Sequence, residues 1–327
     1  MGGYQLNLDR RRMMIGLTSA SCTALAACAA KPMVANIAPF FERSSLPIGL
    51  QFGLVGDDAR RDIDAAFAQI AQLGFREVEL SDLFGRKPAE LAVAAANAGV
   101  KIASLHLPLM AMGGPAALSM MSEPARIADV MGELRAQWAI APILMIPRTF
   151  RPTPGERMEA AIGKAIAAAG EDIWKETADV LNSRAAALKP LGVGVAYHNH
   201  NLDFAPVGET TGWDILWKRT DPALVHFEVD VGWVDLAGID PVAFLRKSSG
   251  RVRLLHIRDI AADKPHGFDI SMDSPIVGSG RLDWARILPA AYEAGARHFI
   301  VEQDTANGLS RIDGLERAVQ FLSNVKV

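Results

Sequence analysis

The sequence has almost no cysteine: its 327 residues include two, Cys22 and Cys28, and both precede residue 30. The rest of the chain therefore cannot hold a four-cysteine zinc site or a disulfide framework. Charge of one sign is also scarce, because the formal net charge is −3 and the expected domain has no dense basic stripe. This composition does not favour nucleic-acid binding.

Two sequence patterns that bind nucleotide phosphates are absent as well. No GxGxxG follows the first expected strand, and no GxxxxGKS or GxxxxGKT occurs, so neither a Rossmann site nor a P-loop is predicted. Gly278-Ser279-Gly280 is too short for a phosphate-binding loop, and we interpret it as a tight turn. Apolar residues, in contrast, make up 50% of the chain, enough for a sizeable core.

Residues 1–45 are predicted to be an export signal and linker. Arg10 and Arg11 precede a short run of small apolar residues, which is typical of a secretory signal, and the arginine pair resembles the twin-arginine signal. The run is shorter than the roughly 20 residues of a bilayer span, so no membrane span is expected in the mature domain. Leu25–Cys28 also resembles a lipobox, which would place a lipid anchor on Cys28. An ordinary cleavage site and an uncleaved anchor are the alternatives to this exported, periplasmic protein.

From residue 46 onward, short apolar runs alternate with stretches of helical spacing. The expected strands are residues 46–55, 75–80, 100–109, 142–148, 192–201, 224–233, 253–260 and 298–304. Between them we expect helices, including one over 123–139 and a long one over 154–188 with Gly170 as a candidate break. Eight such units predict parallel strands with right-handed crossovers, and hence a single (β/α)8 TIM barrel over 46–327.

Metal-binding types of side chain stand at the ends of four strands in the second half. His198 and His200 come first, followed by Asp230, His256 and Glu302 on the three later strands. Imidazole and carboxylate together are the usual ligands of divalent metals such as Mn, Fe, Co or Zn. Because parallel strands of a barrel finish at the same mouth, the pattern predicts one divalent metal there.

A metal at that mouth could stabilise the enediolate that forms when a proton leaves the carbon beside a carbonyl group. The candidate bases, which must come within about 3 Å of that proton, are Glu302, His200 and Glu79. His106 or His200 could protonate a departing oxygen, since imidazole titrates near neutral pH. The candidate substrate contacts are Gln51, His106, Asn199, Trp233 and Arg258. The other histidines are interpreted as structural or solvated: His226, His266 and His298.

The chain resembles the xylose-isomerase-like barrel superfamily, and within it the sugar phosphate isomerase/epimerase group. The stretches that carry the resemblance are GLQFGLV, GFREVELSDLFG, VAYHNHNLDF, VDVGWVDLAGIDP, LLHIRDI, VGSGRLDW and FIVEQD. Together they span about residues 47–325. The resemblance implies a metal-dependent enzyme that acts on a small-molecule carbohydrate. Barrels of this kind often form homo-oligomers, although no residue of the chain identifies an interface.

The resemblance also implies a metal held by Asp230, His256 and Glu302, with His198 where many relatives have glutamate. This departure matters because ketose epimerases of the family use two glutamates as paired acid and base. An imidazole in place of one glutamate favours a single proton abstraction followed by loss of a leaving group, as in a dehydratase or a 3-keto-glycoside lyase. A ketose epimerase or isomerase proper and a non-catalytic sugar-binding barrel are the alternatives. Export works against a sugar phosphate as the substrate, since phosphorylated intermediates are normally kept in the cytoplasm.

An endonuclease-IV-like phosphodiesterase is the remaining alternative within the superfamily. Such an enzyme needs a three-zinc cluster with additional histidine and carboxylate ligands, together with a basic face for DNA. Neither feature is evident in the sequence.

Overall fold

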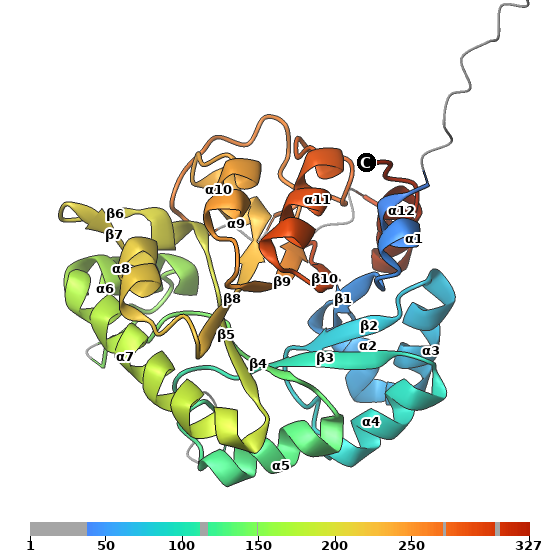
Figure 1. Cartoon of the computed structure of the whole chain (residues 1–327), viewed down its shortest axis with the longest axis horizontal. Helices are drawn as coiled ribbons and strands as arrows, with labels where there is room; N and C mark the ends of the chain where they lie inside the picture. Colours follow the sequence, from blue (N-terminus) through green and yellow to red (C-terminus); the bar gives the residue numbers. More distant parts are fainter. Residues whose placement is uncertain (1–37, 112–116, 149, 271–272, 305–307) are drawn as a thin grey trace, which may run out of the picture. The chain divides into compact units, whose positions relative to one another are not determined.

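Eight parallel strands close into a barrel in the order β1-β10-β9-β8-β5-β4-β3-β2, with helices around it (Figure 1). The computed structural model describes residues 38–111, 117–148, 150–270, 273–304 and 308–327. The barrel strands are β1 (Gly49–Gln51), β2 (Glu77–Leu80), β3 (Lys101–His106), β4 (Trp138–Ala141), β5 (Gly194–His198), β8 (Val225–Asp230), β9 (Val252–Ile257) and β10 (His298–Val301). The predicted single (β/α)8 fold is confirmed. The predicted export signal, with Arg10, Arg11 and Cys28, lies outside the described residues.

The helices occupy the intervals between the strands, and short elements decorate the loops. The α-helices are α1 (Phe40–Ser44), α2 (Gly56–Arg61), α3 (Ile63–Leu73), α4 (Pro88–Asn97), α5 (Pro124–Leu134), α6 (Met158–Ala169), α7 (Glu171–Leu188), α8 (Gly212–Arg219), α9 (Val231–Leu236), α10 (Pro241–Lys247), α11 (Trp284–Ala294) and α12 (Arg311–Leu322). The short elements are η1 (Phe52–Val55), η2 (Lys189–Leu191), η3 (Asn201–Phe204), β6 (Pro206–Val207) and β7 (Thr210–Thr211). Among the described residues, no helix combines the length and the apolar character needed to cross a bilayer.

Capping residues set the ends of several helices. The side chain of Asp62 accepts a hydrogen bond from the amide of Ala65 at the start of α3, and Gly74, with φ of 110°, ends that helix. The expected long helix over 154–188 is two helices, α6 and α7, which meet at Gly170. Gly170 has φ of 61°, a conformation that residues with a side chain rarely adopt, so the candidate break is confirmed.

The prediction of a strand over 142–148 was wrong, because the fourth strand, β4, precedes that segment. The preceding helix α5 ends early, since Arg135 takes a left-handed conformation with φ of 57°. Trp138 then pairs with both neighbouring strands, opposite Ser104 and Gly194. The apolar segment 142–148 is the loop that follows β4. It begins with Pro142, which has no amide hydrogen to give to a sheet ladder.

Helix α1 packs against the barrel, so the folded unit includes residues before the predicted boundary at residue 46. The rings of Phe40 and Phe41 lie 5.4 and 5.8 Å from the ring of Phe299. The amide of Phe40 donates to the carbonyl of Val325, 2.8 Å away. Residues 38–45 therefore belong to the apolar packing of the domain.

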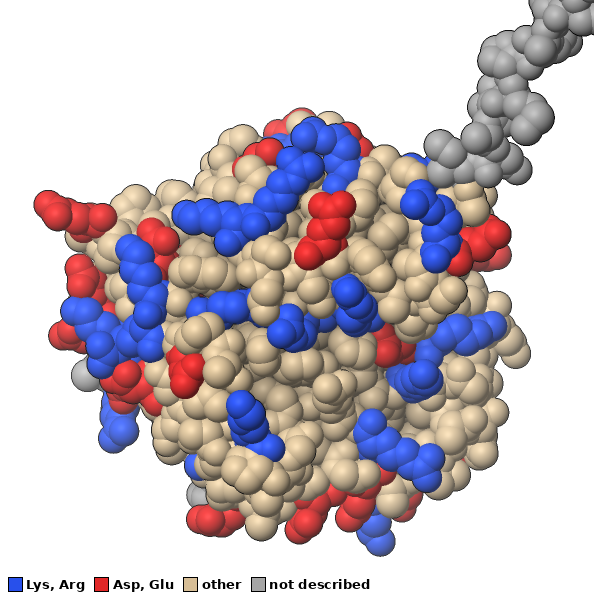
Figure 2. Space-filling view, viewed as in Figure 1, with Lys and Arg blue, Asp and Glu red and all other residues tan. Residues whose placement is uncertain are grey.

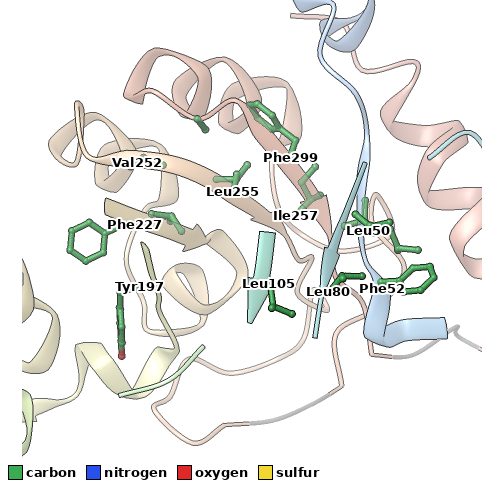
Figure 3. Packing of buried hydrophobic residues seen from close by; sticks show 14 of the residues in the cluster. Leu50, Phe52, Leu80, Leu105, Tyr197, Phe227, Val252, Leu255, Ile257 and Phe299 are labelled. Atoms are coloured by element: carbon green, nitrogen blue, oxygen red, sulfur yellow. The ribbon is translucent and has the colours of Figure 1, made fainter. Parts of the chain in front are cut away.

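Alternation along the strands divides the side chains between two environments. Phe227, Leu255 and Phe299 belong to the large core that packs the strands against the helices (Figure 3). A separate small cluster occupies the opposite side of the strands, inside the barrel: Trp138, Ile140, Ala196 and Leu254. Two residues further along, β5 and β9 carry His198 and His256 on this interior side. Regular strand geometry thus directs these imidazoles inward.

Charged side chains are unevenly spread over the surface. On the face seen in Figure 2, Lys and Arg lie across the middle, and Asp and Glu gather mainly toward the margin. Basic residues stand at or near the starts of four barrel strands: Arg76, Lys101, Arg251, Arg253 and Arg297. The end of the barrel where strands begin therefore carries considerable positive charge.

Candidate metal centre

Six barrel strands bring a carboxylate or an imidazole to the end where the strands finish. The residues are Glu79 on β2, His106 on β3, His198 on β5, Glu228 and Asp230 on β8, His256 on β9, and Glu302 directly after β10. Glu79, Glu228, Asp230 and His256 have no exposed surface, and His198 is almost completely buried. The side chains of His106 and Glu302 keep 13% and 16% of their surface exposed. These two side chains are therefore the members of the cluster most open to solvent.

The four predicted metal ligands lie together, and we call them the outer group. One donor atom from each of His198, Asp230, His256 and Glu302 lies within 4.8 Å of the others. Within the outer group, Nδ1 of His256 is 2.6 Å from Oε2 of Glu302. Two imidazoles and two carboxylates form a donor set that suits a divalent transition metal. The geometry meets what the predicted ligand role requires, and that role stays a prediction.

A second cluster, which we call the inner group, consists of Glu79, His106, Glu228 and His256. Nε2 of His256 lies 2.9 Å from Oε1 of Glu79 and 3.3 Å from Oε2 of Glu228. Nε2 of His106 lies 2.5 and 3.8 Å from the same two oxygens. Ser104 donates a hydrogen bond to the second oxygen of Glu79, 2.7 Å away. Two imidazoles therefore point Nε2 at two buried carboxylates.

Glu228 is the one member of these groups that the sequence analysis missed. It lies inside a stretch that was interpreted only as an apolar strand leading to Asp230. Alternation was the available signal, because residues two apart on a strand face the same side. Oε2 of Glu228 is 3.0 Å from Nδ1 of His198, so this carboxylate also contacts the outer group.

The carboxylates control the charge of the imidazoles. Burial lowers the pKa of His106, but attraction to Glu79 and hydrogen bonds with Glu228 and Glu79 outweigh burial and raise the pKa to about 10. Burial likewise lowers the pKa of His256, and attraction to Glu228, Glu79 and Glu302 raises it well above its ordinary value. The negative electrostatic potential of the carboxylates, which favours protonation of these two imidazoles, would also attract a divalent cation.

Arg258 neutralises part of the acidic charge at the rim of the outer group. Its Nε donates to Oδ2 of Asp230 at 2.8 Å, and Nη2 lies 3.0 Å from Oε2 of Glu302. It also pairs with Asp304, and its guanidinium lies over the ring of Trp233 at 4.7 Å. Burial raises the pKa of Glu302, but attraction to Arg258 and His256 lowers it well below the ordinary range, so Glu302 is ionised.

His200 lies beside the outer group and differs from the other imidazoles in its charge. Its ring is 5.0 Å from that of His198 and 5.5 Å from that of Trp233. Burial, reinforced by His198, lowers the pKa of His200 well below its ordinary value, so the ring is neutral. Nδ1 of His200 has no hydrogen-bond partner among the described residues.

The predicted substrate contacts lie near this site, but most are engaged within the protein. The amide oxygen of Gln51 accepts from the amide of Gly53 at 2.6 Å. The side chain of Asn199 accepts from the amide of Asp230 at 3.0 Å and donates to its carbonyl at 3.2 Å. Trp233 has 1% of its surface exposed. The roles of these side chains in binding a substrate stay predictions.

Comparison with solved structures finds barrels of the same fold. A sugar phosphate isomerase/epimerase from Parabacteroides distasonis aligns with a TM-score of 0.67 and 23% identity, over 86% of this chain and 100% of that one. A xylose isomerase domain protein from Alicyclobacillus acidocaldarius aligns with a TM-score of 0.59 and 17% identity, over 86% of this chain and 97% of that one. The IolI protein, solved with a zinc atom, aligns with a TM-score of 0.58 and 16% identity, over 86% of this chain and 98% of that one. Likeness at these identities establishes the fold alone.

Comparison with curated proteins finds matches of similarly low sequence identity. The inosose dehydratase of Geobacillus kaustophilus is 24% identical over 200 residues, which are 61% of this chain and 63% of that protein. The inosose dehydratase of Clostridium tetani is 26% identical over 231 residues, or 68% and 74% of the two chains. The match therefore spans less than two thirds of the Geobacillus protein. No family model matches the chain.

Proposed function

We propose that the protein is a metal-dependent enzyme that removes a proton beside the carbonyl of a keto-carbohydrate and then eliminates a leaving group. The convergence of His198, Asp230, His256 and Glu302 from four strands carries this proposal. The curated relatives support it, because they are named inosose dehydratases. The fold also resembles that of AsbF from Bacillus anthracis, described as the probable 3-DHS dehydratase, with a TM-score of 0.56 and 11% identity.

The outer group would hold one divalent ion, which would supply Lewis acidity toward a carbonyl oxygen. Mn, Fe, Co and Zn all suit two imidazoles with two carboxylates, and the zinc atom of IolI makes Zn the first ion to test. Arg258, held beside Asp230 and Glu302, keeps a fixed positive charge at the same rim. That charge favours substrate oxygens that become more negative during the reaction.

His200 and Glu302 are the better candidates for the base. His200 is neutral and its Nδ1 has no partner among the described residues, so it can accept a proton. Glu302 is ionised and partly exposed. Glu79 has no exposed surface, and its two oxygens contact Ser104, His106 and His256. We therefore assign Glu79 to supporting His256 rather than to touching the substrate.

Elimination is favoured over epimerisation because the site offers one exposed carboxylate rather than two on opposite faces. His198 stands where the paired-glutamate scheme needs an acid on β5. Glu228, on the neighbouring strand, is completely buried and contacts His198, His106 and His256. In the proposed step, the base takes the proton, a carbon–carbon double bond forms, and the leaving oxygen departs with its electron pair. It receives a proton from His106, whose pKa is raised to about 10 and whose side chain is partly exposed. Epimerisation is the second candidate, supported by the isomerase/epimerase likeness in fold.

The place of action is proposed from the sequence. Arg10 and Arg11 before an apolar run support export, with a lipid on Cys28 as one form of the mature protein. Export would expose the enzyme to unphosphorylated carbohydrates. Fractionation of cells producing the full chain tests this, because an Arg10→Lys, Arg11→Lys variant should stay in the cytoplasm. Equal export of that variant would contradict twin-arginine transport.

Proton exchange tests the reaction directly. The metal-loaded protein would be incubated in heavy water with an inosose and with 3-keto-glycosides, and followed by NMR. We expect the signal of the proton beside the carbonyl to disappear as an unsaturated keto product forms, with deuterium at that carbon only in remaining substrate where the proton transfer reverses. Exchange without elimination would identify an epimerase or isomerase. A fully loaded protein that neither eliminates from nor exchanges a proton in any of these keto-carbohydrates would overturn the proposal.

A further inference from the structure

The inner group has the composition and spacing of a cation site of its own. Its four donor atoms are Nε2 of His106, Nε2 of His256, Oε1 of Glu79 and Oε2 of Glu228. Four adjacent separations between them are 2.5, 2.9, 3.3 and 3.8 Å. A tetrahedral site with bonds of about 2.0–2.2 Å needs donors roughly 3.4 Å apart. Small side-chain adjustments therefore convert the ion pairs of the inner group into a coordination shell.

One carboxylate oxygen of this group has no partner among the described residues. Oε1 of Glu228 is completely buried and has no hydrogen-bond partner among the described residues. Glu79 and Glu228 also place two carboxyl groups, neither with exposed surface, against the same two imidazoles. Buried charge of this kind requires paired cations or a metal.

His256 belongs to both groups but faces them with different nitrogens. Nδ1 lies beside Glu302 of the outer group, whereas Nε2 lies beside Glu79 and Glu228 of the inner group. A neutral imidazole has one nitrogen with a free electron pair and one that carries hydrogen. An ion bound through Nδ1 leaves Nε2–H to donate to Glu79, and an ion bound through Nε2 leaves Nδ1–H to donate to Glu302. His256 in its neutral form can therefore serve one group at a time.

We propose that the inner group is a second divalent-cation site, alternative to the outer group, and that His256 makes occupancy of the two sites mutually exclusive. The protein then holds one ion in either of two positions at neighbouring depths of the barrel. An ion in the inner site would be enclosed by Glu79, His106, Glu228 and His256, away from Asp230 and Glu302. The exclusivity rests on the proposed role of the outer group, whereas the inner site stands on its own donors.

Cobalt titration of metal-free full-length protein tests both statements, with Co²⁺ as the probe for stoichiometry and for the visible spectrum. The outer variant is Asp230→Asn with Glu302→Gln, which keeps an oxygen at residue 230 to accept from the amides of Gly232 and Trp233. The inner variant is Glu79→Gln with His106→Asn. Ser104→Ala is the matched control, because it removes a bond to Glu79 and leaves all donors in place.

We expect one Co²⁺ per chain in the native protein, the outer variant, the inner variant and the control. The two double variants should give different Co²⁺ spectra, and combining all four substitutions should abolish binding. No Co²⁺ in a folded outer variant would overturn the inner site, and two ions in the native protein would overturn exclusivity. Loss of Co²⁺ from the inner variant alone would instead refute the outer site of the proposed function. If circular dichroism shows that the outer variant is unfolded, His198→Gln with Glu302→Gln removes two outer donors while keeping Asp230 paired with Arg258.

Discussion

The two ends of the barrel place the same type of side chain in opposite electrostatic surroundings. His226, near the start of β8, has its pKa lowered to about 4 by burial and by the neighbouring Arg253 and Arg251. His256, near the end of β9, is also penalised by burial, yet Glu228 and other carboxylates raise its pKa well above the ordinary value. Burial acts in the same direction on both rings, so the sign of the surrounding charge decides their protonation.

Strand β2 repeats the contrast with carboxylates two residues apart. Glu77 forms a single pair with His298, with 3.0 Å between Oε1 and Nδ1. Glu79, further along the same strand, meets two imidazoles and lies beside a second carboxylate. Both pairs join glutamate to histidine, but several strands converge on Glu79. Convergence of donors, rather than the presence of an ion pair, distinguishes the candidate site.

The largest effect should separate His256→Ala from His298→Ala. Loss of His256 removes a donor from both groups, so we expect no bound metal and loss of activity beyond the 10–100-fold typical of residues behind metal ligands. Loss of His298 breaks a pair at the other end and should leave metal content unchanged. Elemental analysis and turnover measure both variants. Equal metal content in the two variants would contradict the prediction that metal binds only at the end of the barrel where the strands finish.

The next effect compares two buried arginines. Arg258→Met leaves Asp230, Glu302 and Asp304 without their cation, which should lower the free energy of unfolding by about 3–5 kcal/mol in metal-free protein. Arg251 donates mainly to backbone carbonyls and to Thr220, so Arg251→Met should cost about 1–3 kcal/mol. Urea unfolding measures both. A larger fall in the free energy of unfolding for Arg251→Met than for Arg258→Met would contradict this expectation. It would show that the carboxylates at the rim are stable without a neighbouring cation.

The sequence could predict that the members of the outer group lie together, because each donor ends a short apolar strand; their role as metal ligands stays a prediction. His198, Asp230, His256 and Glu302 are separated in the chain, and the parallel barrel brings their positions together. Glu228 was missed because a buried acid within an apolar strand has no local explanation before its partners are known.

The roles of other side chains could not be predicted, since depth in the barrel depends on three-dimensional packing. Glu79 was a candidate base, yet it has no exposed surface. Trp233 was a candidate sugar contact, yet it lies beneath Arg258. The misplaced fourth strand has a similar cause. The apolar segment 142–148 resembles a buried strand in composition, and the left-handed turn at Arg135 that starts β4 earlier has no glycine to mark it.

The contribution of Asp203, which follows β5, to the free energy of unfolding should depend on pH in the opposite direction to that of His226 at the other end of the barrel. The hydroxyl of Tyr197 donates to Oδ2 of Asp203 at 2.9 Å, and burial raises the pKa of Asp203 from 3.8 to about 8. Between these two pH values the folded state keeps a proton that the unfolded chain releases. The free energy of unfolding should therefore fall as pH rises from about 4 to 8. Asp203→Asn, which keeps the acceptor for Tyr197, should flatten this dependence in urea titrations, and an unchanged slope would contradict the assignment.

The smallest effect should come from His226 and have the opposite sign. Its pKa in the folded protein is about 4, below the ordinary 6.5, so the unfolded chain binds a proton more readily between these values. The free energy of unfolding should therefore fall as pH drops from about 6.5 to 4. The effect should be modest because the side chain is only half-buried and water screens the neighbouring arginines. His226→Asn should remove this contribution and keep the response of Asp203, so the difference between the two unfolding curves isolates the basic end. If the variant instead lost stability more steeply toward pH 4, Arg251 and Arg253 would not be the charges that lower the pKa of His226.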